Sequence, residues 1–274
     1  MIKKVLLITL IISSIFIISC GSNKKEDANL ETVRIGFVGE SDYQIWTPLI
    51  EPLKEKGIKI ELISFADYII PNQALNDGEI DLNAFQHHAF LNNEVQNKGY
   101  KIEAIADTYI SSMNIYSKNI TNVNQVKDKD KVAIPNDPSN GGRALKVLEA
   151  AGLIKVNPAK GDSPTVADIT ENKFNIEIVE VDAGSIFSLL PDVACAVING
   201  NFAVDFGLNP GSDYIFKDDP SIYTGNAFIN LMAVRSEDKD KEVYKKLIET
   251  YQSKIVEDVL INNFKGAYIP TWTK

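Results

Sequence analysis

The stretch Asn83–Leu91 reads NAFQHHAFL and holds both histidines of the chain beside two phenylalanines. It follows Glu79–Leu82, EIDL, an apolar and acidic run that predicts a short strand. The aromatic and imidazole side chains are therefore expected where a strand gives way to a helix, and ligands bind at that edge of a parallel sheet. A phenylalanine-rich helix start could equally pack into a core. The choice between a ligand site and a core therefore depends on the surrounding segments.

Strand-like and helix-like segments alternate around this stretch. Residues 33–39 and 58–65 have strand composition, and 43–55 spaces its apolar residues on one helical face, with Trp46 on the core side. A further strand is predicted at 100–106. Strands separated by helices pair in parallel, so this part of the chain is predicted to form a three-layer α/β lobe.

An aromatic cluster is expected at the edge of this lobe. Phe65–Tyr68 closes a strand just before Pro71, which brings Tyr68 to the same sheet edge as the NAFQHHAFL stretch. The predicted box consists of Tyr68, Phe85, His87 and Phe90. Such a box suits an apolar, polarizable group better than a charge or a sugar.

Two β-prone segments with no helix behind them, Thr108–Ser117 and Phe228–Ser236, flank the middle of the chain. They have the arrangement that a two-strand hinge needs, with the chain leaving a first lobe near residue 112 and returning near 226. We therefore predict lobe I from residues 33–112 and 226–274, and lobe II from residues 113–225. One continuous large sheet is the alternative.

The start of the predicted lobe II contains a candidate anion site. The strand Lys131–Pro135 is followed by NDPSNGGR, Asn136–Arg143, and then by a helix. Ser139 or Asn140 is the predicted N-cap, and the two glycines would let a ligand approach backbone N–H groups at the positive helix end. Arg143 is one of only three arginines. Its planar fork can hold a carboxylate through two parallel bonds; a surface arginine paired with a nearby aspartate is the alternative.

Several later residues complete the predicted lobes. Asn199 and Asn230 lie near the ends of buried strands facing the interlobe space, where an amide can accept from an ammonium or donate to a carboxylate. Asparagine is also common at strand ends for turn reasons alone. Cys195 lies within an apolar strand and is interpreted as a small core residue. An amphipathic helix is predicted at 237–254, with a polar tail after Phe264.

The N-terminus has the features of a secretion signal. Two lysines, an apolar run at 5–18 and then Ser19-Cys20-Gly21 make a leader too short to span a membrane stably. Ile17–Cys20 resembles the lipobox of bacterial lipoproteins, which implies a signal peptide at 1–19 and a lipid on Cys20. Residues 20–32 are then a lipidated cysteine and a solvated tether. An uncleaved signal anchor is the alternative.

The net charge and the absence of known catalytic motifs argue against several classes of function. Removing residues 1–19 takes away two lysines and no acid, so the net charge changes from −9 to −11, which argues against nucleic acid as a partner. There is no phosphate-binding loop, no nucleophile elbow, no HExxH and no dinucleotide fingerprint, so no enzyme and no cofactor are predicted. His87 and His88 point about 100° apart on a helix, and no third histidine or cysteine exists to complete a zinc site.

Four separated segments carry a family resemblance: FADYIIPNQAL with EIDLNAFQHHAFL, then VAIPNDPSNGGRAL, then AVINGNFA, then the strand with Asn230. In this order they resemble the methionine-binding lipoproteins of bacterial ABC importers, the NlpA or MetQ lipoprotein family. The resemblance implies a two-lobed, periplasmic-binding-protein-like fold of type II, each lobe a mostly parallel sheet with helices on both faces. It implies a protein outside the cytoplasm, anchored to the cell membrane through Cys20, that captures L-methionine, or D-methionine, by clamshell closure. The implied partners are the permease and ATPase subunits of the importer.

The resemblance also assigns roles to residues. It places the methionine side chain among Tyr68, Phe85, His87 and Phe90, and the carboxylate on Arg143. Asn140, Asn199 and Asn230 match positions that help to bind the polar end.

The chain departs from the family pattern at two places. Ser111–Asn114 lacks the aromatic-proline or acidic-proline pair of many relatives, and Phe90 stands where tyrosine is frequent. A methionine-containing dipeptide or another apolar amino acid therefore stays open as the ligand. A surface adhesin or sensor without a transporter is the competing class of protein.

Overall fold

The computed structural model describes residues 30–223, 225–264 and 267–272. The predicted signal peptide, the lipidation site at Cys20 and most of the predicted tether lie outside this range. In the described ranges, no helix has both the length and the apolar content that crossing a bilayer requires.

Lobe I is built on a six-stranded sheet in the order β12-β4-β11-β3-β1-β2. Its strands are β1 (Glu31–Val38), β2 (Ile58–Phe65), β3 (Leu82–Asn83), β4 (Ile102–Ser111), β11 (Ile229–Arg235) and β12 (Tyr268–Pro270). β1 pairs in parallel with β2 and β3, whereas β11 is antiparallel to β3 and β4, and β12 is antiparallel to β4. Strands β1, β2, β3 and β4 therefore point the same way, and β11 and β12 run against them. β11 is antiparallel because the chain leaves this lobe along β4 and returns along the adjacent β11.

Lobe II has its own four-stranded sheet in the order β5-β10-β6-β9. The strands are β5 (Met113–Tyr116), β6 (Lys131–Pro135), β9 (Glu177–Val181) and β10 (Cys195–Asn199), with a separate hairpin-like pair β7 (Ile154–Val156) and β8 (Ile169–Asn172). β6 pairs in parallel with β9 and β10, and only β5 is antiparallel. Two separate sheets exclude the alternative of one continuous sheet.

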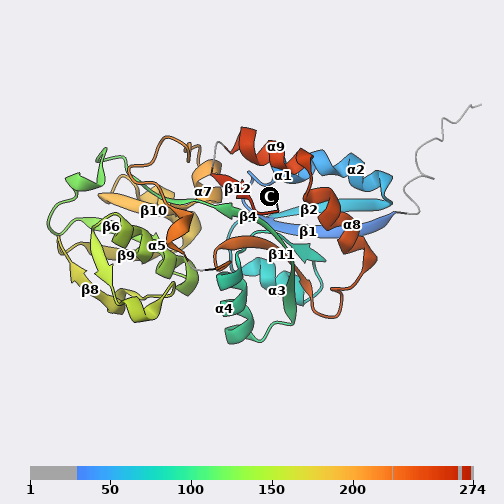
Figure 1. The fold of residues 1–274 in the computed structure, drawn as a ribbon, viewed down its shortest axis with the longest axis horizontal. Helices are drawn as coiled ribbons and strands as arrows, with labels where there is room; N and C mark the ends of the chain where they lie inside the picture. The colour runs from blue at the N-terminus through green and yellow to red at the C-terminus, as the bar shows by residue number, and fades with distance from the viewer. Residues whose placement is uncertain (1–29, 224, 265–266, 273–274) are drawn as a thin grey trace, which may run out of the picture. The chain divides into compact units, whose positions relative to one another are not determined.

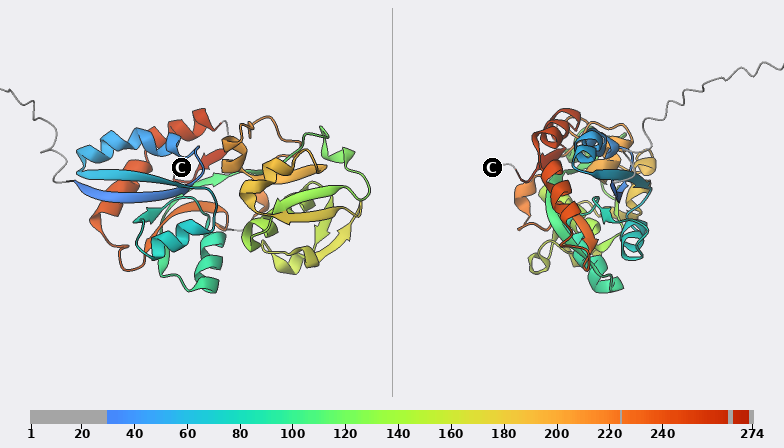
Figure 2. Two further views of the ribbon diagram at one scale, coloured as in Figure 1. Left: turned by 180° about the vertical axis from the view of Figure 1, so that it is seen from behind. Right: turned by 90° about the vertical axis from the view of Figure 1, so that its right-hand side faces the viewer.

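Helices cover both faces of each sheet (Figure 1; seen from behind in Figure 2). In lobe I, α1 (Tyr43–Trp46), η2 (Thr47–Leu49), α2 (Ile50–Glu55), α8 (Glu242–Tyr251) and α9 (Lys254–Asn263) share one core, and α3 (Ile70–Asn76) and α4 (His88–Lys98) pack on the other face. In lobe II the helices are α5 (Pro138–Ala150), α6 (Ile186–Leu189) and α7 (Gly200–Asp205). Short 3-10 turns are η3 (Val123–Gln125), η4 (Pro158–Lys160), η5 (Val166–Asp168), η6 (Ala183–Ser185) and η7 (Pro220–Ile222).

The strands separate their side chains between two cores, as the two-residue repeat of a strand requires. In β11, Met232 joins the core under α1 and α8, while Leu231 and Ala233 join the core under α3 and α4. In β10, Cys195 is fully buried in the core on the α5 face, which confirms that it is a core residue. Trp46 is likewise 1% exposed and packs in the first core of lobe I, as predicted.

The lobes are joined where β4 ends at Ser111 and β5 begins at Met113, and the chain enters lobe I again at β11. Between the strands, the Ser112 backbone N–H donates to Ala267 O over 2.9 Å. The helix predicted at 237–254 is shorter, because α8 spans Glu242–Tyr251 and a separate helix, α9, begins at Lys254. The polar tail predicted after Phe264 is wrong, because β12 lies in it. Tyr268 of β12 is 1% exposed and stacks on the rings of Tyr109 and Phe264, at 4.4 and 4.3 Å between centroids.

Candidate functional site

A pocket of about 490 Å³, including the solvent at its mouth, lies where the loops of the two lobes meet. All eight residues predicted for the ligand line it: Tyr68, Phe85, His87, Phe90, Asn140, Arg143, Asn199 and Asn230. The structure therefore brings together in one wall side chains that are up to 162 positions apart in the sequence.

The loop that carries Phe85 and His87 is fixed from behind by three buried amides. Gln86 Nε2 donates to Asn72 Oδ1 over 2.6 Å and to Asn83 Oδ1 over 2.9 Å. Asn72 Nδ2 returns a bond of 2.8 Å to Gln86 Oε1. Because buried amides are costly unless they are paired, this network holds the loop in one conformation and fixes the directions of its aromatic side chains.

His87 is the N-cap of α4 and is a neutral hydrogen-bond donor. Its Nδ1 accepts from the Phe90 backbone N–H over 3.1 Å, so the proton resides on Nε2, which donates to Asn140 Oδ1 over 3.3 Å. Burial, together with the charge of Arg143, lowers the pKa of His87 to about 3. The imidazole thus connects the two lobes through a bond between neutral groups.

His88 points away from the pocket. Its Nε2 lies 2.6 Å from Asp107 Oδ1. Across the described ranges of the chain, no cluster of three or more histidine, cysteine, aspartate or glutamate side chains could hold a metal ion.

The aromatic side chains form a box with contributions from both lobes. The rings of Tyr68, Phe85 and Phe90 are mutually 5.9 Å apart between centroids, Tyr68 stacked on Phe85 and both edge-on to Phe90. From lobe II, Phe202 approaches the Tyr68 ring at 5.1 Å, and Asn201 Oδ1 accepts from the Tyr68 hydroxyl over 2.6 Å. These rings give the pocket an apolar, polarizable wall, the kind of surface with which a thioether makes favourable contacts.

The asparagines form the polar wall of the pocket. Asn199 Nδ2 donates to Asn140 Oδ1 over 2.7 Å, and Asn140 Nδ2 donates to the carboxylate of Asp137. Asn199 Oδ1 is buried and has no hydrogen-bond partner in the described part of the chain. Asn230 Nδ2 donates to Tyr109 O over 3.2 Å. An unpaired carbonyl oxygen here is an acceptor suited to a ligand ammonium.

The sequence predicts that the Arg143 guanidinium binds a ligand carboxylate through two parallel hydrogen bonds, but part of this group already binds the protein itself. It is 2% exposed, and its NH2 group donates to Ser111 O and to Asp218 Oδ2, each over 2.7 Å. The rings of Tyr223 and Phe228 lie 5.0 and 4.9 Å from the guanidinium carbon. The predicted alternative of an aspartate partner is therefore present, but it is a buried pair and not a surface one.

One donor of Arg143 is still uncommitted. Its Nε is buried without a hydrogen-bond partner among the residues described. Burial alone would lower the pKa of Arg143, but the oxygens of Tyr223 and Asp218 raise it, so the guanidinium stays charged. It can therefore give a carboxylate one charge-assisted hydrogen bond through Nε.

The start of α5 differs from the prediction. Asp137 is the N-cap, its carboxylate accepting from the Asn140 backbone N–H over 2.9 Å, and Arg143 falls in the second turn. A Cβ at Gly141 would lie 2.9 Å from Pro135 O, and one at Gly142 3.1 Å from Pro164 O. The two glycines therefore allow close packing of the helix against the protein itself, and they do not open backbone N–H groups to a ligand.

Several residues of the pocket wall are not among those predicted from the sequence. They are Asp42, Tyr109, Ser111, Gly200 and Tyr268. A Cβ at Gly200 would lie 2.2 Å from Ser111 Oγ, so glycine is needed where α7 approaches β4. Asp42 precedes a helix, where aspartate is common as a cap, so the sequence carried no signal of its role.

A second set of contacts joins the lobes beside the pocket. Asp205 at the end of α7 accepts from the backbone N–H of Ser41 over 2.7 Å and of Glu40 over 3.3 Å. Gly39 has φ +90°, and a Cβ there would lie 1.8 Å from Asp205 Oδ2. The turn after β1 is thus shaped to receive a carboxylate of the opposite lobe.

Comparison with known proteins identifies a family model, relatives and solved structures that are similar to this chain over most of its length. The family model described as NlpA lipoprotein matches residues 33–272. The chain is 36% identical over 265 residues to the D-methionine-binding lipoprotein MetQ of Escherichia coli, covering 96% of this chain and 95% of that protein. Its structure is similar to a nutrient binding protein from Burkholderia cenocepacia bound to methionine, with 37% identity, a TM-score of 0.83 and coverage of 87% and 99%. Protein PG110 from Staphylococcus aureus is 42% identical, with a TM-score of 0.82 and coverage of 87% and 94%.

Proposed function

The chain belongs to the NlpA lipoprotein family, and from that premise we propose that it is a solute-binding protein that captures methionine between its lobes. It delivers the amino acid to the permease and ATPase subunits of an ABC importer. It acts outside the cytoplasm, held to the cell membrane by a lipid on Cys20. It binds its ligand without converting it.

The observation that carries this proposal is the division of one pocket into a polar and an aromatic part. Arg143 Nε is a charged donor without a partner, and Asn199 Oδ1 is an acceptor without a partner, both among described residues. They suit the carboxylate and the ammonium of one amino acid. The box of Tyr68, Phe85 and Phe90 then receives the side chain.

The apolar contacts set a limit on selectivity. Burying a methionine side chain contributes roughly 1.5 to 3 kcal/mol, and sulfur–aromatic contact adds about 0.3 to 1.5 kcal/mol. One methylene more or less is worth roughly 1 to 3 kcal/mol. Leucine is therefore expected to bind weakly, and amino acids without an apolar side chain hardly at all.

Capture proceeds by closure of the lobes. Tyr68 reaches Asn201, His87 reaches Asn140, and Asp205 reaches Ser41, so the described conformation already has the two lobes in contact. A ligand that touches both lobes favours this arrangement over an open one because it gains all its contacts only there. The closed form is the one that the permease recognises.

Calorimetry tests the proposal. Residues 31–274 are titrated with L-methionine, D-methionine, leucine, a methionyl dipeptide and serine, alone and as the variants Phe85→Ala and Phe206→Ala. Phe85 lines the pocket, whereas Phe206 is 40% exposed outside it and serves as the control.

We expect methionine to bind more tightly than leucine, with Phe85→Ala weakening it about tenfold or more and Phe206→Ala leaving it unchanged. A dipeptide that binds while free methionine does not would transfer the proposal to that ligand. The absence of any amino-acid binding would refute it.

A further inference from the structure

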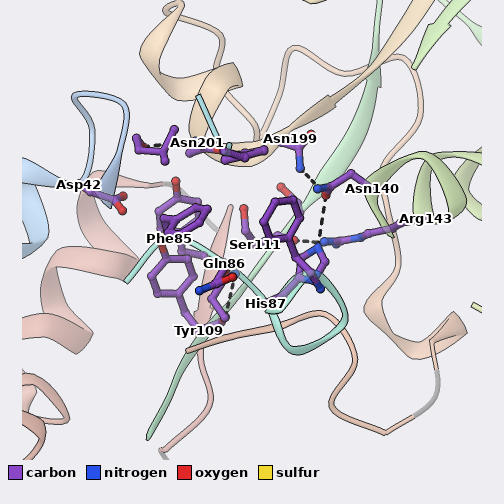
Figure 3. A pocket seen from close by; sticks show the side chains of 17 residues that line it. Asp42, Phe85, Gln86, His87, Tyr109, Ser111, Asn140, Arg143, Asn199 and Asn201 are labelled. Carbon is purple, nitrogen blue, oxygen red and sulfur yellow. Dashed lines mark hydrogen bonds between the residues drawn. The ribbon is translucent and has the colours of Figure 1, made fainter. Parts of the chain in front are cut away.

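The end of the pocket opposite Arg143 carries a buried carboxyl. Figure 3 shows Asp42 at one end of the pocket and Arg143 at the other, with the aromatic rings between them. Asp42 is 2% exposed, lines the pocket, and its Oδ1 has no hydrogen-bond partner in the described ranges. The Tyr268 hydroxyl, 1% exposed in the same wall, is also without a hydrogen bond of normal geometry there.

This carboxyl lacks a counter-charge. The charged group that acts on it is a second acid, Asp205 of α7, and no ion pair of either carboxyl with a lysine, arginine or histidine is found among the described residues. Burial first, and then Asp205, raise the pKa of Asp42 well above its ordinary value, although the nearby Tyr109 hydroxyl counteracts this in part. A carboxyl kept out of water with no cation beside it is costly for the protein alone.

The walls beside Asp42 are aromatic. Tyr68, Phe85 and Tyr109 line the pocket together with Asp42. The faces of aromatic rings are negative and attract a cation, and the attraction is greatest where the cation has lost its water. A carboxyl surrounded by ring faces is the combination by which proteins select alkylated cations over neutral groups of the same shape.

We propose that the inner end of the pocket is a subsite for a cationic side-chain terminus, so that its ligands include amino acids whose thioether sulfur is alkylated to a sulfonium. This inference rests on the proposed function, because the amino-acid head at Arg143 and Asn199 directs the side chain toward Asp42. A neutral thioether would fill the aromatic box but leave Asp42 unpaired. A sulfonium would fill the same box and favour loss of the Asp42 proton to solvent, so that the carboxylate becomes its counter-ion.

A pair of ligands isolates the charge. S-methylmethionine ends in a dimethylsulfonium, and homoleucine has the same shape with a neutral CH in place of the sulfur. Both are titrated calorimetrically against residues 31–274, beside methionine. We expect the sulfonium to bind about tenfold or more tighter than homoleucine.

Two variants isolate the residue. Asp42→Asn keeps the size of the side chain and removes its charge, whereas Glu40→Gln removes an exposed charge two positions away. Asp42→Asn is expected to abolish the preference for the sulfonium, and its thermal melt shows whether the variant folds. Glu40→Gln is expected to retain the preference.

Three results would overturn the subsite. The first is equal binding of S-methylmethionine and homoleucine to the unaltered protein. The second is a preference for the sulfonium that survives Asp42→Asn. The third is tighter binding of methionine sulfoxide than of the sulfonium, which would make Asp42 a hydrogen-bond donor. Methionine binding in the unaltered protein separates these outcomes from a failure of the proposed function, in which methionine itself would not bind.

Discussion

Replacing Arg143 by alanine should affect both folding and binding, and a second substitution should separate the two. The guanidinium is buried against Asp218, whose side chain is fully buried and also accepts from the Met113 backbone N–H over 3.1 Å and from the Tyr223 hydroxyl over 2.7 Å. Arg143→Ala leaves this carboxylate without its cation. Adding Asp218→Asn removes the unpaired charge, keeps an oxygen for the Met113 backbone N–H and presents the amide NH2 to the Tyr223 hydroxyl, which can accept as well as donate.

The magnitudes follow from the burial of the pair. Removing one member of a buried ion pair costs about 3 to 5 kcal/mol of unfolding free energy, which for a domain of this size corresponds to a fall in Tm of roughly 6 to 20 °C. Loss of a charge-assisted hydrogen bond to a ligand carboxylate costs about 1.5 to 3 kcal/mol, roughly 10- to 150-fold in Kd. The double variant should recover most of the stability and none of the affinity.

Thermal melts and methionine calorimetry on the two single variants and the double variant provide the test. Lys146→Ala is the control on the same helix: this lysine pairs with Glu149 at the surface, and a change of at most about 1 kcal/mol is expected. If the double variant regained methionine affinity together with stability, Arg143 would hold the fold alone and the carboxylate would bind elsewhere.

Three smaller effects are expected. Tyr68→Phe removes the hydrogen bond to Asn201, so methionine should bind roughly 2- to 10-fold more weakly by calorimetry; unchanged affinity would mean that this bond does not support closure. Gly200→Ala places a Cβ against Ser111 and should lower the unfolding free energy by roughly 1 to 3 kcal/mol in urea titrations, and an unchanged midpoint would contradict the tight approach of α7. His87 has its pKa lowered to about 3 in the fold, so its contribution to stability is complete above about pH 6.5 and is lost as the pH falls toward 3. His87→Asn should therefore flatten the acid side of the Tm profile, and an unaltered slope would place the titration on other groups.

Much of the site could be predicted because its residues lie at strand ends. The end of β3 and the start of α4 place Phe85 and His87 at a sheet edge, and β6, followed by Asp137-Pro138, places Asn140 at a helix start. The spacing of apolar residues along the sequence indicates where strands end, and therefore which residues lie at the edge of a sheet.

The remaining features depend on long-range contacts. Asp218 is a partner of Arg143 from 75 positions away, and nothing local in the sequence indicates that pairing. The antiparallel β4–β11 pair depends on the return path of the chain. Tyr268 lies in a short segment of ordinary composition and becomes a core residue only because β12 pairs with β4.

We propose that bound methionine places its thioether among the rings of Tyr68, Phe85 and Phe90 and its carboxylate at Arg143. Co-crystals of the protein with selenomethionine as the ligand test it directly, because selenium gives an anomalous signal that the sulfur atoms of the chain do not match. One strong peak is expected inside the aromatic box, beside these three rings. A peak beside Arg143 with the box filled by its own side chains, or a peak outside the interlobe pocket, would contradict it.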